Sequence, residues 1–265
     1  MSTSPSPVLG LLHPGEMGAA VGHCLTERGH QVLWASQDRS PHTADRAKAA
    51  GLTDAGTIAA LAAGAEVILS ICPPHAALDV ASAVAATASF QGLYVDANAV
   101  SPQTAAQVAD VITQAGAMYA DGGIIGPPPV TGGSTRLYLS GEDAARAQAL
   151  FTGTPVDSRV ITAGPYAASS IKMAYAAWTK GSAALLLTVM SLAQAEGVED
   201  DLRGEWALSQ PTLEALLKGA GNSSARKGWR WVAEMEEIAA TMTAAGLPPG
   251  FHQAAAEVYR RSTRG

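Results

Sequence analysis

Short apolar runs alternate with alanine-rich segments through the first half of the chain. The runs read "PVLGLL", "QVLWAS", "EVILSI" and "LYVDA", and helical spacing follows from about Glu16, near Ala44 to Ala50, and after Ser101 and Pro102. A serine before a proline is typical of a helix N-cap with a pre-set first turn. Strands that alternate with helices predict an α/β fold with a doubly wound parallel sheet.

The pattern changes in the second half of the chain. Strands are predicted at "AMYADGG", "STRLYLS" and "DSRVIT", with a helix over Gly141 to Phe151, and no strand pattern follows Gly164. Helical patterns then cover Pro165 to about Glu196, Trp206 to Leu217, Trp229 to Ala245 and Phe251 to Arg261. The sequence therefore predicts a doubly wound domain over residues 1–163 and an all-helical domain over residues 164–265.

Composition narrows the class of ligand. The chain is 48% hydrophobic and 15% charged with a net charge of -6, so no basic surface indicates a nucleic acid partner, and small-molecule ligands are expected. The start "MSTSPSPV" lacks the basic and apolar parts of a signal peptide, and "GSAALLLTVMSLA" falls short of the roughly 20 residues that cross a bilayer. We therefore expect a cytoplasmic protein without a membrane partner. Cys24 and Cys72 lack metal-ligand spacing, which predicts buried thiols and no metal site.

The stretch "GLLHPGEMG", residues 10–18, lies between the first strand and the first helix. Gly15 and Gly18 keep the final spacing of the G-x-G-x-x-G fingerprint, although Leu11 to Pro14 lengthen the turn after Gly10. Backbone N–H groups and the helix dipole at such a position favour a pyrophosphate. An ordinary strand-to-helix turn is the alternative, because a single glycine loop is weak evidence.

The second strand ends in "WASQDRS". NAD-binding folds usually place an acidic residue here to bind the ribose hydroxyls, but this chain has Ala35 or Ser36 at that position. Ser36, Arg39 and Ser40 could instead bind a 2′-phosphate. This arrangement favours NADP. Asp38 keeps NAD open, and Arg39 as a solvated loop residue is the other reading.

Polar residues follow later strands at "ICPPH", "DANAVSP" and "DGGIIGPPP", the edge where open α/β sheets bind ligands. We expect Asn98 to face the nicotinamide or the substrate, and Asp96 to cap or bridge between loops. His75 is expected to cap a helix rather than to catalyse. For His13, both helix capping and catalysis stay open.

Lys172, Tyr175, Ala176 and Thr179 fall at i, i+3, i+4 and i+7 and predict one stripe on one face of a long helix. A lysine in a water-poor cleft can have its pKa lowered toward neutrality, so that it gives a proton to a carbonyl oxygen as hydride reaches the carbon. That role suits Lys172. A lysine that reaches solvent is the alternative.

In this order, these residues resemble the 3-hydroxyacid dehydrogenase and 6-phosphogluconate dehydrogenase superfamily over nearly the whole chain. "HPGEMG" and the C-terminal "WRWVAEMEEIAATMTAAGLPPGFHQAAAEVYRR" resemble a subgroup whose helical domain has no assigned function. The resemblance implies an N-terminal Rossmann domain, a helical domain that forms much of a homodimer interface, and an active site between the domains. It also implies that Lys172 is the catalytic lysine and that Asn98 contacts substrate or cofactor.

The cofactor-binding candidates combine the glycine loop, the segment after the second strand and the later loops. They are Gly10, His13, Pro14, Gly15, Glu16, Met17, Gly18, Ser36, Arg39, Ser40, Cys72, Pro73, Pro74 and Asn98.

Several positions depart from the hydroxyacid enzymes. Ile125 stands where they carry a serine that holds the substrate carboxylate, Ala176 replaces their asparagine, and Tyr166 and Ala168 replace their glycines. These changes imply a more apolar pocket. The substrate-binding candidates are Gly123, Ile124, Ile125, Ala176, Trp231 and Met235.

The sequence thus predicts an NADP-preferring oxidoreductase that moves hydride between nicotinamide and the C=O or CH–OH of a small, fairly apolar hydroxy acid or related carbonyl compound. Lys172 would be the general acid/base, Tyr175 and Asn98 would orient the reacting oxygen, and Thr179 would assist. Two alternatives remain. The first is an imine reductase, because the segment "YADGGIIGPPPVTGGSTRLYLSG" also resembles that family, whose members usually carry Asp or Tyr in place of Lys172. The second is a dinucleotide-binding sensor without catalysis.

Overall fold

The computed structural model describes residues 6–130 and 132–261. The start of the chain, on which the expectation about a signal peptide depends, lies outside the described residues. The chain separates into two compact units, Met1–Lys172 and Met173–Gly265, so the division falls inside one long helix. Each unit is described by itself.

The first unit is built on one eight-stranded sheet with the order β3-β2-β1-β4-β5-β6-β7-β8. Strands β1 to β6 run parallel, β7 is antiparallel to β6, and β8 is parallel to β7. The predicted doubly wound sheet is confirmed, with the β6–β7 pair as an antiparallel addition. The bounds are β1 Leu9–Leu12, β2 Val32–Trp34, β3 Thr53–Asp54, β4 Val67–Ser70, β5 Leu93–Asp96, β6 Met118–Ile125, β7 Thr135–Ser140 and β8 Val156–Val160.

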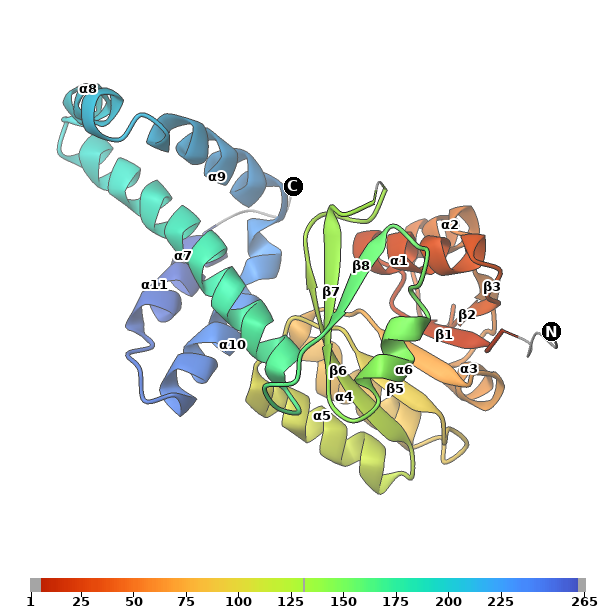
Figure 1. The fold of residues 1–265 in the computed structure, drawn as a ribbon. Helices are drawn as coiled ribbons and strands as arrows, with labels where there is room; N and C mark the ends of the chain where they lie inside the picture. Colours follow the sequence, from red (N-terminus) through yellow and green to blue (C-terminus); the bar gives the residue numbers. More distant parts are fainter. Residues whose placement is uncertain (1–5, 131, 262–265) are drawn as a thin grey trace. The chain divides into compact units, whose positions relative to one another are not determined.

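Helices cover both faces of this sheet (Figure 1). On one face α1, α2 and α6 pack against the strands, and on the other face α3, α4 and α5 do so. The central strands β1, β4 and β5 are buried along their whole length, which explains their near-continuous apolar runs. The bounds are α1 Glu16–Glu27, α2 Pro41–Ala49, α3 Ile58–Gly64, the short 3-10 helix η1 Pro74–Ala76, α4 Ala77–Ala85, α5 Pro102–Gln114 and α6 Ala144–Ala149.

Side-chain caps mark the starts of α2, α3 and α5 in this unit. The Ser101 hydroxyl accepts a hydrogen bond from the backbone N–H of Thr104 at 3.1 Å, with Pro102 in the first turn, as the sequence predicts. The predicted helix over Gly141 to Phe151 is shorter, because α6 covers only Ala144–Ala149.

The second unit consists of helices, which confirms the predicted all-helical C-terminal region (Figure 1). A continuous helix over Trp206 to Leu217 is wrong, because the chain leaves helical geometry between Ser209 and Leu213, around Pro211. Proline lacks the N–H of an interior helix position and clashes with the preceding turn. The bounds are α7 Ala167–Ala195, α8 Glu199–Ser209, α9 Leu213–Lys227, η2 Gly228–Arg230, α10 Trp231–Ala244 and α11 Gly250–Arg260.

Buried aromatic and charged groups hold the second unit together. Trp231 meets Tyr259 edge-to-face with 5.0 Å between ring centroids, and the Tyr259 hydroxyl donates to the Lys180 carbonyl at 2.6 Å. The Lys180 ammonium forms an ion pair with Glu234 and lies 5.3 Å from the centroid of the Trp231 ring. These contacts fix the middle of α7 to α10 and α11.

Helix α7, Ala167–Ala195, extends beyond the apolar stretch "GSAALLLTVMSLA", which by itself is too short to cross a bilayer. It has 29 residues, and its most apolar window has a mean hydropathy of 1.2, so by length and composition it could cross a membrane. This is weak evidence, because a long helix within a folded domain passes the same test. The cytoplasmic location therefore stays a prediction.

Candidate active site

The glycine loop joins β1 to α1 through a close backbone approach. A Cβ atom on Gly18 would lie 2.4 Å from the His13 carbonyl oxygen, so only glycine fits at this point. Gly15 precedes α1 in extended geometry and has no side chain with which to cap the helix. The first-turn N–H groups, with the positive end of the helix dipole, are therefore suited to an anion such as a pyrophosphate.

The residues inserted into this loop bind the segment that follows β2. His13 Nε2 lies 2.7 Å from the Arg39 guanidinium, and the Nε–H of Arg46 donates to the Pro14 carbonyl at 3.2 Å. Burial, followed by the charges of Arg39 and His75, lowers the pKa of His13 from 6.5 to about 4. The loop and the segment that the sequence assigns to cofactor selection thus form one connected structure.

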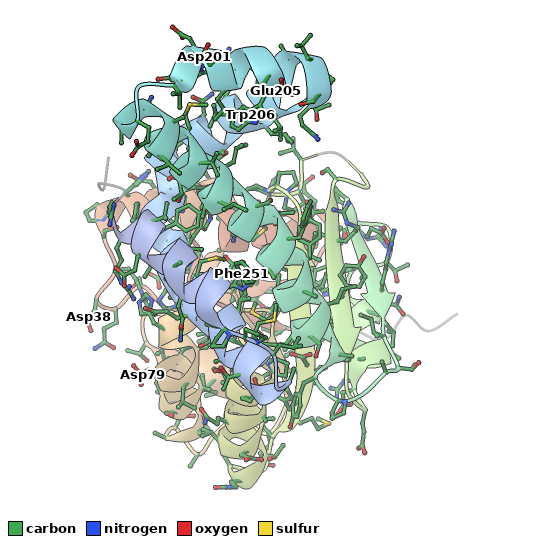
Figure 2. The ribbon with its side chains drawn as sticks, turned by 90° about the vertical axis from the view of Figure 1, so that its left-hand side faces the viewer. Asp38, Asp79, Asp201, Glu205, Trp206 and Phe251 are labelled. Carbon is green, nitrogen blue, oxygen red and sulfur yellow. The ribbon has the colours of Figure 1, made fainter. Side chains whose placement is uncertain are left out.

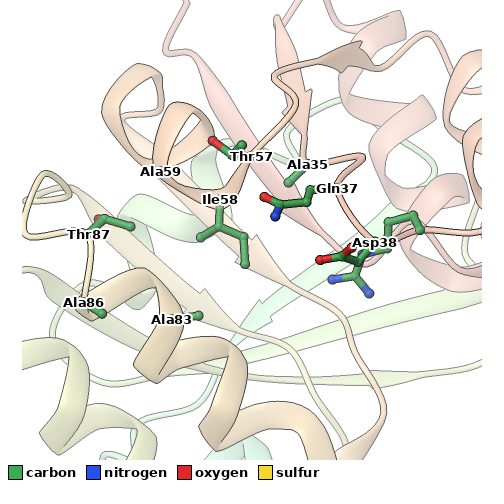
Figure 3. Close-up of a pocket in the computed structure, with 10 residues that line it drawn as sticks. Ala35, Gln37, Asp38, Thr57, Ile58, Ala59, Ala83, Ala86 and Thr87 are labelled. Atoms are coloured by element: carbon green, nitrogen blue, oxygen red, sulfur yellow. The ribbon is translucent and has the colours of Figure 1, made fainter.

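A cavity of about 680 Å³ opens beside this segment (Figure 3). Its volume is within the range of ligand pockets, roughly 300–1,000 Å³. Ser40, next in the chain to Arg39, caps α2, because its hydroxyl accepts from the Thr43 N–H at 3.3 Å. Polar and apolar side chains share the lining, which suits an adenosine. The lining residues are Ala35, Gln37, Asp38, Arg39, Thr57, Ile58, Ala59, Ala83, Ala86 and Thr87.

Asn98 joins the carboxyl ends of two neighbouring strands. Its side-chain oxygen accepts from the Cys72 N–H at 2.6 Å, its side-chain nitrogen donates to the Ser70 hydroxyl at 3.0 Å, and its backbone N–H donates to Asp96 at 3.1 Å. The residue is only 2% exposed. Both ends of the amide are thus used within the protein, and Asn98 positions the loop at Cys72 and Pro73. Cys24 and Cys72 are both buried free thiols, as expected.

Asp121 on β6 anchors the start of α7. Its carboxylate accepts from the Ser169 N–H at 2.8 Å, the Ser169 hydroxyl at 2.6 Å and the Ser140 hydroxyl at 2.9 Å. The Ser140 hydroxyl also accepts from the Ala168 N–H at 2.9 Å. Sequence reasoning missed this anchor, although the serines just before the lysine and the aspartate of "DGG" were visible signals.

Gly123, two positions after Asp121, lets α7 approach the strand closely. A Cβ atom on Gly123 would lie 2.5 Å from the Ala168 carbonyl oxygen and 3.0 Å from the Lys172 Cβ. Because β6 runs past the end of β5, this contact lies at the carboxyl edge of the sheet. The structure therefore brings Lys172 to the edge that carries the glycine loop and Asn98.

The remaining stripe residues lie along α7. Tyr175 is 46% exposed, Ala176 is buried, and the Thr179 hydroxyl donates to the Tyr175 carbonyl at 3.0 Å. The Thr179 hydroxyl proton is thus used within the helix.

The expected substrate-binding residues divide between the two units. Ile124 and Ile125 are buried in β6, at 9% and 3% exposed. Trp231 and Met235 belong to α10 of the second unit, where Met235 is fully buried and Trp231 packs on Tyr259.

Comparison with known proteins identifies the family. The family described as the NAD binding domain of 6-phosphogluconate dehydrogenase matches residues 8–151, and the family described as a domain of unknown function (DUF1932) matches residues 193–262. An uncharacterized 28.5 kDa protein of Methanothermus fervidus is 29% identical over 195 residues, which cover 73% of this chain and 74% of that protein.

Solved structures share the fold over the whole chain. The 3-hydroxyisobutyrate dehydrogenase of Mycobacterium tuberculosis, solved with L-serine, is 19% identical with a TM-score of 0.71, over 97% of this chain and 94% of that one. A reductive aminase of Aspergillus terreus, solved with NADPH, cyclohexanone and allyl amine, is 18% identical with a TM-score of 0.61, over 97% of this chain and 93% of that one. With more than half of its length matched by the first family, and with a glycine loop and pocket that fit a dinucleotide, this chain belongs to the family of the NAD binding domain of 6-phosphogluconate dehydrogenase and is an NAD(P)-dependent oxidoreductase.

Proposed function

We propose that the protein is an NADP-preferring oxidoreductase that acts on the C=O or CH–OH group of a small, fairly apolar hydroxy acid or related carbonyl compound, with Lys172 as general acid/base. One observation carries the proposal. The contact of Gly123 with the first turns of α7 holds Lys172 at the same sheet edge as the glycine loop.

The chain's residues would divide the work as follows. The glycine loop would hold the pyrophosphate, and the cavity beside Arg39 would hold the adenosine. When bound, the nicotinamide supplies or accepts a hydride. Lys172 would donate a proton to the substrate oxygen during reduction and remove one during oxidation. Asn98 would position the Cys72 loop, and Tyr175, one turn beyond the lysine, would orient the substrate.

The substrate class is inferred from two positions that the resemblance assigns to the substrate. Ile125 and Ala176 carry no hydrogen-bonding groups, so the two positions that hold a carboxylate and a hydroxyl in hydroxyacid enzymes are apolar here. Apolar residues at these two positions favour a substrate with less charge.

Replacement of the lysine tests the proposal. Lys172→Ala should lower kcat by about two to four orders of magnitude and leave the dissociation constant for NADPH nearly unchanged. Lys218→Ala, at an exposed lysine of α9, is the matched control and should leave both quantities unchanged. Unchanged turnover in Lys172→Ala would remove the lysine from the mechanism.

Reduction of a C=N bond is the second candidate function. The apolar residues Ile125 and Ala176 favour it, because neither provides a group that would bind a substrate hydroxyl. The assay is oxidation of NADPH and NADH at matched concentrations with 3-keto acids, neutral ketones and aldehydes, and cyclic imines. Turnover confined to imines would favour the second candidate, and tight NADPH binding with no turnover on any carbonyl or imine would favour a dinucleotide sensor.

The preference for NADP rests on Arg39, opposed by its neighbour Asp38. Arg39→Ala should weaken NADPH more than NADH, whereas Asp38→Asn should shift the preference further toward NADPH by removing a negative charge near the 2′-phosphate. Dissociation constants for the two cofactors would show both effects.

The helical region from residue 164 onward would serve for substrate binding and dimerisation. Trp178, Leu185 and Leu192 recur every seven residues along α7 and are 74%, 60% and 60% exposed. Phe251 on α11 also lies on the outside and is 79% exposed (Figure 2). Apolar surface of this extent is typical of an interface, and we assign it to a second copy of the chain. Leu185→Glu should convert a dimer to a monomer in sedimentation experiments, and a monomeric wild type would contradict the assignment.

A further inference from the structure

His13 occupies an unusual backbone conformation at the centre of the glycine loop. Its φ angle is +64°, a left-handed value that few residues other than glycine adopt. Its carbonyl oxygen accepts the Gly15 N–H at 2.8 Å and faces Gly18, so the backbone on both sides holds this conformation. The loop therefore fixes the backbone of His13, and the contact with Arg39 orients its imidazole.

The imidazole binds Arg39 as a neutral acceptor. A guanidinium has only donors, so His13 Nε2, 2.7 Å away, must accept the hydrogen bond and the ring proton must lie on Nδ1. The lowered pKa of His13, about 4, agrees with a neutral ring at physiological pH. Nδ1 is buried without a hydrogen-bond partner in the part of the chain that the structure describes. The bond to Arg39 therefore fixes this tautomer, although a buried donor without an acceptor is costly.

Arg39 is the cationic residue of the cavity lining. Asp38 before it has a φ angle of +59°, and the Arg39 N–H donates to the Ser36 carbonyl at 3.1 Å, so a tight turn presents the arginine. An arginine side chain has several flexible bonds, and a bond from its guanidinium to a rigid loop removes most of that freedom. The second bond between the segments, from Arg46 to Pro14, keeps the loop at this position.

We infer that His13 is a positioning residue for cofactor choice, which holds the Arg39 guanidinium ready for the 2′-phosphate of the cofactor. The inference rests on the proposed NADP preference and extends it to a residue 26 positions away in the sequence. A guanidinium ordered in advance binds a phosphate with less loss of side-chain entropy. The bond between His13 and Arg39 acts on the guanidinium, so the expected effect is confined to the 2′-phosphate.

The test uses two nucleotides that need no substrate. Calorimetry would measure the dissociation constants of adenosine 2′,5′-bisphosphate and adenosine 5′-monophosphate on the full chain. His13→Asn keeps a residue that tolerates a positive φ but removes the acceptor at Nε2. It should lower the preference for the bisphosphate by about 2- to 12-fold, the effect of ordering one flexible side chain, and leave the monophosphate unchanged. His13→Gln, whose amide oxygen reaches the position of Nε2, should restore most of the preference.

Two further variants separate the inference from the proposed function. Arg39→Ala should abolish the preference for the bisphosphate, and Lys48→Gln, a charge change elsewhere on α2, should leave it close to wild type. If Arg39→Ala lowers the preference and His13→Asn does not, the role of His13 is refuted. A loss of equal size for both nucleotides in His13→Asn also refutes it, because the residue then only maintains the loop. If the wild type shows no preference, the proposed choice of NADP fails instead.

Discussion

Replacement of Gly123 by alanine tests the contact that holds Lys172 in place. The new Cβ would lie 2.5 Å from the Ala168 carbonyl oxygen, about 0.9 Å short of the 3.4 Å at which ordinary contact begins. This oxygen belongs to the backbone, so it cannot turn aside as a flexible side chain would. The first turns of α7 must therefore move relative to β6.

The magnitude follows from what resists this movement. Ser169, in the same turn, holds Asp121 through bonds of 2.6 Å and 2.8 Å, and a shift of this size would break or strain both. Overpacking costs about 1–3 kcal/mol, and weakened bonds to a carboxylate add to it, so we expect Gly123→Ala to lose about 3 kcal/mol. At roughly 2–4 °C per kcal/mol for a chain of this size, Tm should fall by about 6–12 °C.

The assay combines thermal unfolding with steady-state kinetics below the transition. A displacement near 1 Å of a catalytic group can cost about 100-fold in rate, so kcat should fall by about that factor while the affinity for adenosine 2′,5′-bisphosphate is kept. Gly204→Ala is the matched control, because this exposed helical glycine has no neighbour within 4 Å of a new Cβ. It should stabilise the protein by about 0.5–1 kcal/mol. Normal Tm and kcat in Gly123→Ala would refute the reasoning.

Three further predictions concern other parts of the chain. Burial, with Asp121 nearby, raises the pKa of Asp96 from 3.8 to about 7, so the folded state holds this proton more tightly than the unfolded state. The free energy of unfolding should therefore fall as pH rises from about 4 through 7, by on the order of 4 kcal/mol. Asp96→Asn should remove most of that dependence in urea titrations at pH 5 and pH 8. An equal change with pH in the wild type and the variant would contradict this prediction. Lys180→Met should destabilise the protein by about 3–5 kcal/mol by leaving the buried Glu234 carboxylate without this cation, and Glu234→Leu in the same chain should recover much of the loss; a double variant no more stable than the single one would count against the pair. Gly18→Ala should weaken NADPH binding by about tenfold or more in calorimetry, since the His13 carbonyl would have to move, and an unchanged dissociation constant would show that the loop adapts.

The sequence by itself determined the order of layers and the glycine loop between β1 and α1. Apolar runs of four to six residues with helical spacing between them are local signals, and they gave the parallel sheet because buried strands must be apolar on both faces. Ser101 before Pro102 fixed a helix start for a reason contained in two neighbouring residues. Gly18 likewise specifies a local close approach, because it meets the carbonyl of His13 only five residues earlier in the chain.

Short or interrupted elements were harder to derive. Strand β3 has two residues and α3 has seven, too few for a hydrophobic period to stand out from an alanine-rich background. Pro211 marked a break that the apolar pattern on both sides concealed.

Only the tertiary structure decided which polar groups meet. His13 and Arg39 are 26 residues apart, Asn98 and Cys72 are also 26 apart, and Asp121 and Ser169 are 48 apart. Nothing in the local pattern records such pairs, because a hydrogen bond across the sheet edge depends on where two loops end after the strands have paired. The same packing gave Asn98 a positioning role and gave Gly123 its close contact with α7, so the chemistry of the site depends on distances that the sequence pattern does not contain.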